Sequence, residues 1–538
     1  MKKKSLSARL FALLLAGLLT SGCSAQPSTD ASEPAASDAP SSQSEASGNY
    51  NASGLPIFRE PETFTIAVSK RSLSKNSYAE KECTLETEKA TNIKIEWTEI
   101  PESGWGEKIN IMFASGDLPD AILGGVDVVK NLDSLARLDP YFNEESTPAI
   151  LQLFEDYPEV PKALETEDGG IYSLTTGNYG FWLSMGDIFY INQKWLDALN
   201  LPMPETTEDF YEVLKAFKDQ DPNGNGTADE IPFTFVGAED LYPLMGAFGI
   251  TEDKNHVQVR NDKVEFTADQ DTYLEALRYL NRLYTEGLLD VEAFSQTTDQ
   301  MVAKGKNAEP ILGSFCEYLN DVVASNYDDF AVLTPLRGPD GDQLMPELIT
   351  NPGNISGFVI TKNCRQPEAL VRWYDYCNST FDIRMLWGFG PENTSWKFDE
   401  SGKWTSTNDN LPEGMAWGEY RHTVSGGSVA PVFCIDETPE IKIFNERDER
   451  RNDAVLTYLE YVPEQNLPAG FESLEVKEAR DILYTDIDSY IKNFVATSII
   501  NGISDEQWQE HLNKCKALKT DEYAALWQKT YDTKNKLR

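Results

Sequence analysis

The chain has 538 residues and a formal net charge of −41, from 47 basic and 88 acidic side chains. Hydrophobic residues make up 40% of it, an ordinary globular composition that excludes disorder along most of the chain. At about 150 residues per domain, this length suits three or four units or two large lobes. So acidic a surface repels a phosphate backbone, which argues against nucleic-acid binding.

The N-terminus has the features of an export signal. Basic residues, from Lys2 to Arg9, precede the apolar run Leu10–Leu19. Ten apolar residues are too few to cross about 30 Å of hydrocarbon as a helix, so a signal peptide is predicted over residues 1–22. The small residues before Cys23 resemble a bacterial lipobox, which implies that Cys23 is lipidated (palmitate or a similar acyl chain). The alternative is ordinary signal cleavage nearby, with Cys23 incidental.

The segment after Cys23 differs from the rest of the chain. Residues 24–54 are rich in Ser, Ala, Pro, Asp and Glu and contain no Lys or Arg. Such a segment buries too little apolar surface to offset its ordering entropy. We therefore expect a flexible tether over residues 23–59, between the membrane anchor and the globular part.

The remaining cysteines and the histidines indicate no metal-binding motif. None of the six cysteines forms a CxxC pair, and the three histidines are scattered, which argues against a zinc site. Six thiols in so large a domain also do not make a disulfide scaffold, and their pairing is left open by the sequence. They are Cys83, Cys316, Cys364, Cys377, Cys434 and Cys515.

The first part of the folded region alternates between strand and helix patterns. Strands are predicted at Thr63–Ser69, Ile93–Trp97 and Ala121–Leu123, and a helix at Glu107–Ala114. This alternation favours a mostly parallel α/β sheet.

Further along the chain, apolar stripes at helical spacing predict helices at Glu208–Lys218 and Thr272–Glu286. Ser504 and Gln507 have capping-box spacing before a third helix. All three stripes are interpreted as core packing.

The most specific local motif is the loop Asp221–Glu230, which concentrates oxygen-bearing side chains between glycines. Alternating residues direct their oxygens toward one point when glycines let the loop turn sharply, and Ca²⁺ takes six to eight such oxygens. The predicted ligands of a structural Ca²⁺ are Asp221, Asn223, Asn225, Thr227 (by its carbonyl), Asp229 and Glu230.

Two registers are possible for this loop. One starts at Asp219 and ends at Glu230, with Gly224 at the turn, but leaves Asp229 unused. The preferred one starts at Asp221 and has Gly226 at the turn. The alternative to a metal site is a solvated Asx-Gly turn.

Several motifs in a fixed order resemble one family. They are Trp195-Leu196, Pro202 and Pro204, Thr206–Phe210, Leu214–Phe217 and the 221–232 loop, with Ala114–Asp120, Leu283–Leu288 and Lys362–Ala369 in agreement. This order is similar to the extracellular solute-binding proteins, family 1. The closest subgroup is the large calcium-carrying one that includes LplA-type lipoproteins and alginate-oligosaccharide binders. The resemblance covers most of residues 60–535.

The resemblance implies an α/β, two-lobe periplasmic-binding-protein fold with three interlobe crossings, near residues 172–180, 355–360 and 425–432. The first lobe is then expected over 60–176 and 358–428, and the second over 177–357 and 429–538. The ligand of such a fold lies between the lobes, at the carboxyl ends of strands.

The resemblance also implies a ligand site, whose aromatic faces and charged groups suit sugars. The expected contacts are Lys70, Arg71, Gly124, Gly125, Asp127, Trp182, Ser184, Phe315, Glu317 and Tyr318. Alternatives remain for three of them: Trp182 and Phe315 as core aromatics, and Asp127 as a helix cap.

The function implied is a non-enzymatic, monomeric lipoprotein that captures an oligosaccharide and delivers it to an ABC permease. Because the chain has no GxxxxGK[ST] motif, the ATPase would be a separate subunit. Two alternatives are a sensory lipoprotein that presents its solute to a membrane kinase, and a secreted glycan-active enzyme. For the enzyme, the abundant carboxylates offer acid pairs, but no GxSxG or HExxH motif is present.

Overall fold

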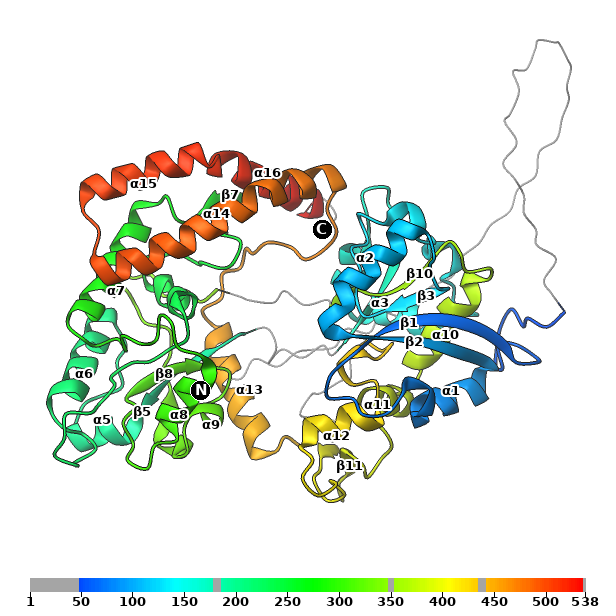
Figure 1. The fold of residues 1–538 in the computed structure, drawn as a ribbon, viewed down its shortest axis with the longest axis horizontal. Coiled ribbons are helices and arrows are strands. Elements are labelled where there is room, and N and C mark those ends of the chain that lie inside the picture. The colour runs from blue at the N-terminus through cyan, green and yellow to red at the C-terminus, as the bar shows by residue number, and fades with distance from the viewer. Residues whose placement is uncertain (1–47, 178–184, 347–352, 434–441, 536–538) are drawn as a thin grey trace, which may run out of the picture. The chain divides into compact units, whose positions relative to one another are not determined.

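The structure, a computed structural model, describes residues 48–177, 185–346, 353–433 and 442–535. The predicted signal peptide, Cys23 and most of the tether lie outside these ranges. Residues 49–538 form one compact unit (Figure 1).

The ordered fold begins earlier than the tether prediction allowed. Tyr50 forms a β-bridge with Phe58, and the side chains of Ile57 and Phe58 are fully buried in the first core. The expected end of the tether at residue 59 is therefore about ten residues too late. Because residues 24–54 are mostly polar, their composition did not indicate that Tyr50, Ile57 and Phe58 anchor this segment.

The first lobe contains a five-stranded sheet of order β2-β1-β3-β10-β4. Strand β1 pairs in parallel with β2 and β3, whereas β10 pairs antiparallel with both β3 and β4. The sheet is thus mixed, not mostly parallel as predicted. The strands are β1 (Glu62–Lys70), β2 (Ile93–Pro101), β3 (Ala121–Leu123), β10 (Asn354–Ile360) and β4 (Ser173–Thr176).

Helices cover both faces of this sheet. Because side chains alternate along a strand, Ile66 and Val68 of β1 pack in one cluster with α1, α10 and α11, and Ala67 packs in another with Ile109 of α2. The helices of this lobe are α1 (Glu82–Thr91), α2 (Trp105–Ser115), α3 (Pro148–Asp156), α4 (Glu159–Leu164), α10 (Pro367–Asn378), α11 (Phe381–Phe389) and α12 (Trp417–Val424). A hairpin of β11 (Trp396–Phe398) and β12 (Trp404–Ser406) lies between α11 and α12.

The second lobe is built on a smaller antiparallel sheet of order β8-β5-β9, with a separate hairpin of β6 and β7. Its strands are β5 (Ile188–Asn192), β6 (Val257–Arg260), β7 (Lys263–Phe266), β8 (Ser314–Glu317) and β9 (Phe330–Val332). Its helices are α5 (Gln193–Leu199), α6 (Thr207–Asp219), the 3-10 helix η6 (Ala238–Phe248), α7 (Asp271–Thr285), α8 (Thr298–Gly305), α9 (Asn320–Val323), α13 (Glu446–Leu459), α14 (Leu474–Asn501), α15 (Asp505–Ala517) and α16 (Thr520–Asn535).

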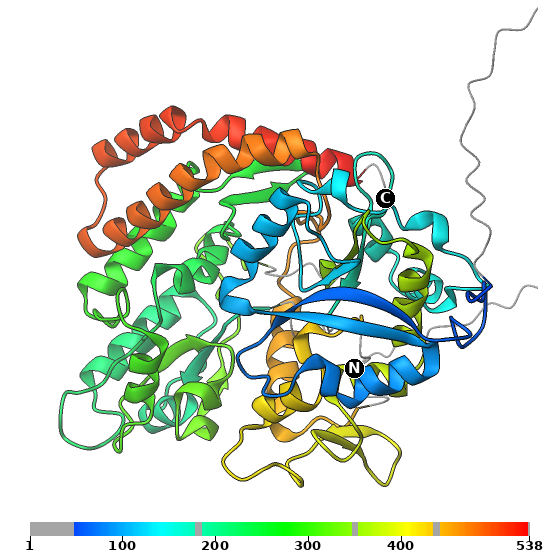
Figure 2. The same cartoon turned by 45° about the vertical axis from the view of Figure 1, so that its right-hand side comes forward.

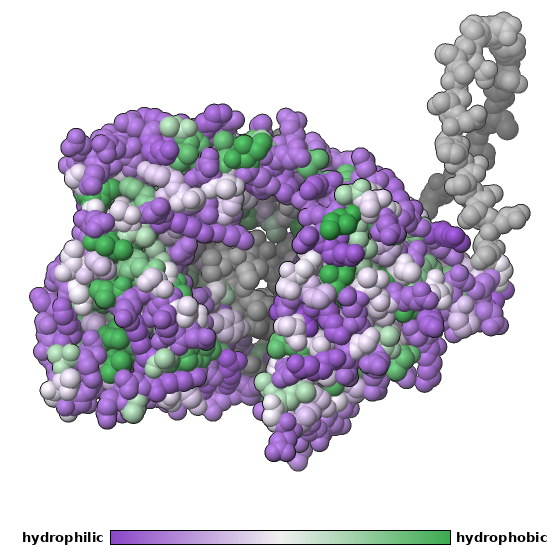
Figure 3. All heavy atoms as spheres, in the orientation of Figure 1, coloured by the Kyte–Doolittle hydropathy of each residue, from purple (hydrophilic) through white to green (hydrophobic). Residues whose placement is uncertain are grey.

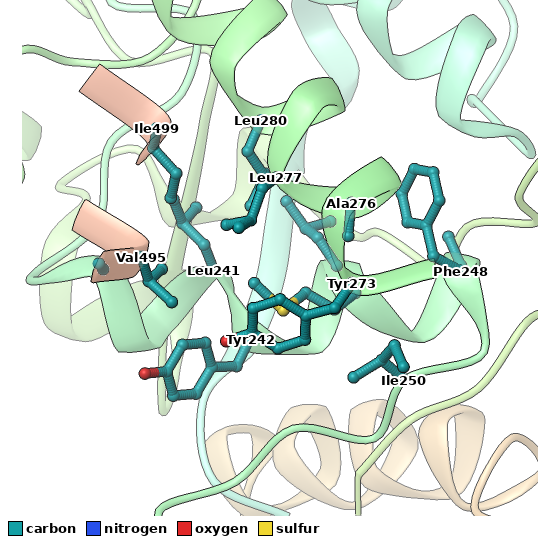
Figure 4. Close-up of a cluster of buried hydrophobic side chains, with 14 of the residues drawn as sticks. Leu241, Tyr242, Phe248, Ile250, Tyr273, Ala276, Leu277, Leu280, Val495 and Ile499 are labelled. Carbon is teal, nitrogen blue, oxygen red and sulfur yellow. The ribbon is translucent and has the colours of Figure 1, made fainter. Parts of the chain in front are cut away.

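The C-terminal helices complete the core of the second lobe. Helix α14 contacts both α7 and α16, and Figures 1 and 2 show it running beside them. Between α7 and α14, Leu277, Leu280, Val495 and Ile499 gather in one apolar cluster (Figure 4), and each is at most 1% exposed. Burying four such side chains contributes several kcal/mol to the stability of this packing.

Along the chain, the elements change lobe between β4 and β5, between β9 and β10, and between α12 and α13. Two lobe boundaries differ from the sequence-based expectation. Strand β10 begins at Asn354, four residues before the expected start of the second part of the first lobe. At the other end, Val432 is buried in the first core and the backbone N–H of Phe433 donates to Asn378, so the first lobe extends beyond residue 428.

The locally coded elements are confirmed. Helices α6 and α7 occupy the two predicted stripes to within a residue. The predicted capping box at α15 is formed by two hydrogen bonds: the N–H of Gln507 donates to Ser504 Oγ at 3.2 Å, and the N–H of Ser504 donates to Gln507 Oε1 at 2.8 Å.

The surface agrees with the high negative charge. Hydrophilic side chains cover most of the face shown in Figure 3. Among the described residues, no helix has the length and apolar character needed to cross a membrane. The cysteines in these ranges are all buried free thiols: Cys83, Cys316, Cys364, Cys377 and Cys515.

A buried charged histidine joins the loop before β6 to α14. The side chain of His256 is fully buried, with Nδ1 2.5 Å from Glu252 Oε1 and Nε2 3.3 Å from Asp488 Oδ1. A neutral imidazole donates from one nitrogen only, so two carboxylate partners favour the protonated ring. Burial alone would lower the pKa of His256, but the hydrogen bond and the charge of Glu252 raise it above its usual value.

We expect His256 to stabilise the fold in a pH-dependent way. Its raised pKa means that the stabilisation is complete below about pH 6.5 and is lost as the pH rises through the folded-state pKa. Asparagine tolerates the positive φ of 56° at this position. His256→Asn should cost about 1–3 kcal/mol near pH 6, measured as a lower Tm, and less near pH 9.

The control is His422→Asn. His422 Nδ1 lies 2.7 Å from the carbonyl of Gly418, and burial lowers its pKa, so that ring is neutral. Its Tm deficit should not shrink as the pH rises. A deficit of His256→Asn that is the same at both pH values would contradict the charged assignment.

Candidate functional site

The expected ligand contacts after β1 are engaged in ion pairs. Lys70 Nζ lies 2.6 Å from Glu99 Oε2, and Arg71 Nη1 lies 2.9 Å from Glu102 Oε2. Burial would raise the pKa of Glu99, but hydrogen bonds from Lys70 and Ser77 lower it overall. The two cations therefore contribute little net charge to this edge of the first lobe.

Two glycines shape the end of β3. Gly124 has a φ of 141° and Gly125 a φ of 92°, both in the region that side chains disfavour. A Cβ on Gly124 would lie 2.6 Å from the Cβ of Ser69, so only glycine allows β3 to end beside β1. Trp105 Nε1 donates to the carbonyl of Gly125 at 2.8 Å, and the amide of Asn354 lies against the same glycine. This edge thus presents backbone and amide groups.

Asp127 has local partners that explain its position. Its Oδ1 accepts a hydrogen bond from the N–H of Lys130 at 3.1 Å, as the capping alternative requires. Its other oxygen lies 3.3 Å from Lys477 Nζ of α14. Asp127 therefore caps a turn and forms an ion pair with Lys477 of the second lobe.

The corresponding edge of the second lobe is acidic. Ile188 pairs with Glu317 across β5 and β8, which brings Asp187 and Glu317 to the same end of the sheet. One ligand atom each of Asp187, Asp240 and Cys316 lies within 4.8 Å of the others. Of the four residues at this end of the sheet, sequence reasoning predicted Glu317 alone as a ligand contact. Asp240 was missed because it comes from η6 and nothing local in the sequence marks it.

Burial and mutual repulsion strongly affect the protonation of this group. Burial raises the pKa of Asp240 to about 7, with further contributions from Asp187 and Glu317. Burial raises the pKa of Glu317 as well, and the Asp187 charge adds to it. Burial likewise raises the pKa of Asp187, although the Arg451 charge opposes this. The cluster is therefore a set of carboxyl groups that can form hydrogen bonds and whose negative charges raise one another's pKa.

Arg451 of α13 fixes the start of β5 beside this cluster. Its guanidinium lies 4.0 Å from the centre of the Tyr318 ring and donates to the carbonyls of Met185, Gly186 and Tyr318. The partial burial of Tyr318 thus comes from stacking under an arginine. This arginine was not found from the sequence, since it lies more than 130 residues from Tyr318.

Phe315 belongs to the core of the second lobe. It is fully buried, with its ring centre 4.9 Å from that of Phe330 and 5.5 Å from that of Tyr190. This placement agrees with the alternative reading of Phe315 as a core aromatic and leaves no face open to a ligand. The predicted contacts Trp182 and Ser184 lie outside the described residues.

A cavity of about 220 Å³ lies at the acidic edge. Its lining comes from the start of β5, the middle of β8, helix η6, the loop before β6 and α14. The lining residues include Asp187, Asp240, Tyr242, Glu252, Cys316 and Lys492.

The 221–230 loop is a separate candidate site, for a cation. The carboxylate of Asp221 accepts hydrogen bonds from the N–H groups of Asn225 and Gly226, at 3.1 and 3.0 Å. The side-chain amides of Asn223 and Asn225 both donate to Asp229, at 3.1 to 3.3 Å. These contacts bring the side chains together, in the register that starts at Asp221.

Glu230 provides the strongest sign that this loop suits a cation. Its Oε1 is buried and has no hydrogen-bond partner in the described part of the chain. Burial raises the pKa of Glu230, and the charges of Asp229 and Asp221 raise it further. A hard divalent cation would satisfy the buried oxygen and remove this repulsion, whereas a solvated turn would leave both uncompensated.

Comparison with known proteins gives a consistent result. Residues 71–380 match the family model described as "Bacterial extracellular solute-binding protein". The chain is 31% identical over 515 residues to the fructooligosaccharide ABC transporter substrate-binding protein FusA of Streptococcus pneumoniae serotype 4. That match covers 90% of this chain and 93% of FusA.

Two Bacillus subtilis (strain 168) proteins match shorter parts. Lipoprotein LipO is 30% identical over 306 residues, which are 52% of this chain and 58% of LipO. The polygalacturonan/rhamnogalacturonan-binding protein YtcQ is 26% identical over 301 residues, which are 53% of this chain and 57% of YtcQ.

Solved structures of FusA extend the agreement to three dimensions. FusA in complex with kestose superposes with a TM-score of 0.73 at 29% identity, over 89% of this chain and 100% of that one. A FusA structure described as an EF-hand mutant, in complex with fructo-nystose, has a TM-score of 0.72 at 29% identity over the same shares. The two-lobe α/β fold predicted from the sequence is thereby confirmed.

Proposed function

The chain belongs to the bacterial extracellular solute-binding proteins, and from this membership we infer that it captures an oligosaccharide and delivers it to the permease of an ABC importer. The observation that carries the inference is the match to FusA, which extends over nine-tenths of the chain and includes the fold. The chain's own strand-end groups support it, because carboxyl, amide and aromatic groups are those that recognise sugar hydroxyls and ring faces.

In this role the protein binds its solute and leaves it unchanged. Of the three carboxyl groups in the cluster, Asp187 and Glu317 lie at strand ends on one sheet edge, an arrangement that suits a binding site. The relatives described above are substrate-binding proteins. Energy for import would come from an ATPase on another chain, as the sequence lacks a phosphate-binding loop.

The binding function is tested by isothermal titration of the secreted chain against neutral oligosaccharides, beginning with kestose. At least one should bind with a Kd near 1 μM or tighter, which corresponds to about −8 kcal/mol. Chromatography after prolonged incubation should recover that sugar intact. Cells lacking the protein should lose uptake of the labelled sugar.

Three results would go against the proposal. Hydrolysis products would indicate an enzyme. Binding without any effect on uptake would favour a sensory role. Failure to bind any saccharide would remove the carbohydrate assignment.

We further propose that the 221–230 loop holds one structural Ca²⁺ through Asp221, Asn223, Asn225, Asp229, Glu230 and the carbonyl of Thr227. The buried oxygen of Glu230 supports this, as does the EF-hand mentioned for FusA. The loop is attached to the segment before β8 by backbone hydrogen bonds between residue 231 and residues 311 and 313. Bound calcium would thus strengthen the connection between α6 and the second sheet.

Calcium should raise stability without taking part in sugar binding. A chelator should lower the Tm, because a ligand of the native state present at 100 times its Kd contributes about 2.7 kcal/mol. Asp221→Ala combined with Asp229→Ala should abolish the chelator effect, measured by thermal melting, while the sugar Kd changes little.

Asp399→Ala is the matched control for calcium. Asp399 also caps an exposed turn, by accepting from the N–H groups of Ser401 and Lys403, and lies far from the 221–230 loop in the sequence. This variant should keep its chelator sensitivity. A wild-type melting curve that is unaffected by chelator would rule the site out.

Membrane attachment is proposed to occur through a lipid on Cys23, by way of the 24–48 tether. The lipobox-like sequence supports it, together with the similarity to a lipoprotein and to a family of extracellular proteins. Cys23→Ala should move the protein from the membrane pellet to the soluble fraction or medium, measured by immunoblotting. Cys364→Ala, which alters a buried thiol of the folded part, should leave it in the pellet. A membrane-bound Cys23→Ala protein would disprove the anchor.

A further inference from the structure

The cavity at the acidic edge carries an unusual excess of negative groups. Among the residues that the structure describes, five acidic side chains and two lysines line it. One of the lysines, Lys492, is already paired with Asp488 and Glu239, at 3.3 and 3.5 Å. Glu252 is paired with His256 at 2.5 Å, and Asp253 accepts two hydrogen bonds from Asn255. Among the described lining residues, Asp187 and Asp240 are therefore the carboxyl groups that remain for whatever enters the cavity.

A second observation, independent of the charge, indicates a polar ligand. Tyr242 of η6 lines the same cavity and is only 5% exposed, yet its hydroxyl has no hydrogen-bond partner among the residues that the structure describes. Figure 4 shows its ring at the edge of the apolar cluster, with the hydroxyl directed away from Phe248 and Ile250. A buried hydroxyl without a partner costs free energy, which a ligand with a hydrogen-bonding group would recover.

The size and chemistry of the cavity restrict that ligand. At about 220 Å³ it is smaller than the roughly 300–1,000 Å³ of pockets for drug-sized molecules, and suits one sugar ring. Carboxylates are acceptors only, and they form short, strong hydrogen bonds with hydroxyl donors. Pro243 and the ring of Tyr242 offer apolar surface to the C–H face of such a ring.

We propose that this cavity is a subsite for one uncharged sugar ring, whose hydroxyls donate to Asp187 and Asp240, and that the same carboxylates exclude uronic acids. The proposal rests on the proposed function and narrows it to neutral oligosaccharides. A carboxylate on the ring would face like charges in a partly buried setting, where repulsion is strong. The chain would therefore share the neutral ligand class of FusA rather than the polygalacturonan specificity of YtcQ.

The test compares a charged trisaccharide with its neutral counterpart and with a second neutral sugar. Trigalacturonate, its carboxyl-reduced neutral trisaccharide and kestose are titrated into the full folded chain at pH 8, above the pKa of about 7 of Asp240. We expect at least one neutral sugar to bind and trigalacturonate to bind at least 100-fold more weakly than the better of them. Asp240→Asn should weaken neutral binding about tenfold and reduce the discrimination against trigalacturonate to less than tenfold.

Two further variants keep the test decisive. Asp187→Asn should act in the same direction and replaces Asp240→Asn if that variant fails to fold. Asp269→Asn is the matched control: burial raises the pKa of Asp269 to about 6, but this side chain does not line the cavity, so both affinities should be unchanged.

The outcomes separate the subsite from the general function. Trigalacturonate binding as tightly as a neutral sugar would overturn the subsite proposal and leave oligosaccharide capture intact. Neutral binding with discrimination unaffected by Asp240→Asn and Asp187→Asn would also overturn it. Failure of every saccharide to bind would remove both proposals together.

Discussion

Strand β10 lies between β3 and β4 in the first sheet, although it follows nearly all of the first part of the second lobe in the sequence. Its residues Phe358, Val359 and Ile360 are fully buried, so the first core is incomplete until the chain has returned from the second lobe. Helix α14 places the same requirement on the second lobe, because it packs on α7 from about 190 residues away. Each lobe is thus completed by a segment that the chain reaches only after it has passed through the other lobe.

This interleaving explains why the lobes are joined by more than one crossing. Closing such long loops costs conformational entropy that grows only slowly with length, and burial of the strand and helix offsets it. The first change of lobe falls beside strand ends, since β4 ends shortly before it and β5 begins shortly after it.

The sequence predicted what is encoded locally and missed what depends on distant contacts. Strand β3, helix α6 and the capping box at Ser504 depend on residues within a few positions, and all were found. The direction of β10 and the extension of the first lobe to Phe433 depend on partners from other parts of the chain. The boundaries were therefore displaced by several residues.

The candidate sites show the same division. The 221–230 loop could be predicted because its oxygens lie within ten consecutive residues. Asp187, Asp240 and Cys316 come from three separated segments, and no spacing in the sequence links them. Phe315 shows the opposite difficulty: an aromatic residue near a strand end suits a sugar contact or a core equally, and only its fully buried position between Tyr190 and Phe330 separates the two.

The two strand-end edges differ in the way that recognition of a neutral sugar would require. At the first edge, Lys70 and Arg71 are neutralised by Glu99 and Glu102, which leaves mainly backbone and amide groups around Gly125. At the second edge, no ion pair of Asp187, Asp240 or Glu317 is formed among the residues that the structure describes, and burial chiefly raises the pKa of Asp240 to about 7. Holding such a cluster costs stability in the unliganded protein, because each charged form is disfavoured by burial and by its neighbours. A sugar bound there would reduce that cost by donating its hydroxyls to the carboxylates. The electrostatic cost of the buried carboxyl groups would therefore favour binding of ligands that donate hydrogen bonds to them without adding charge.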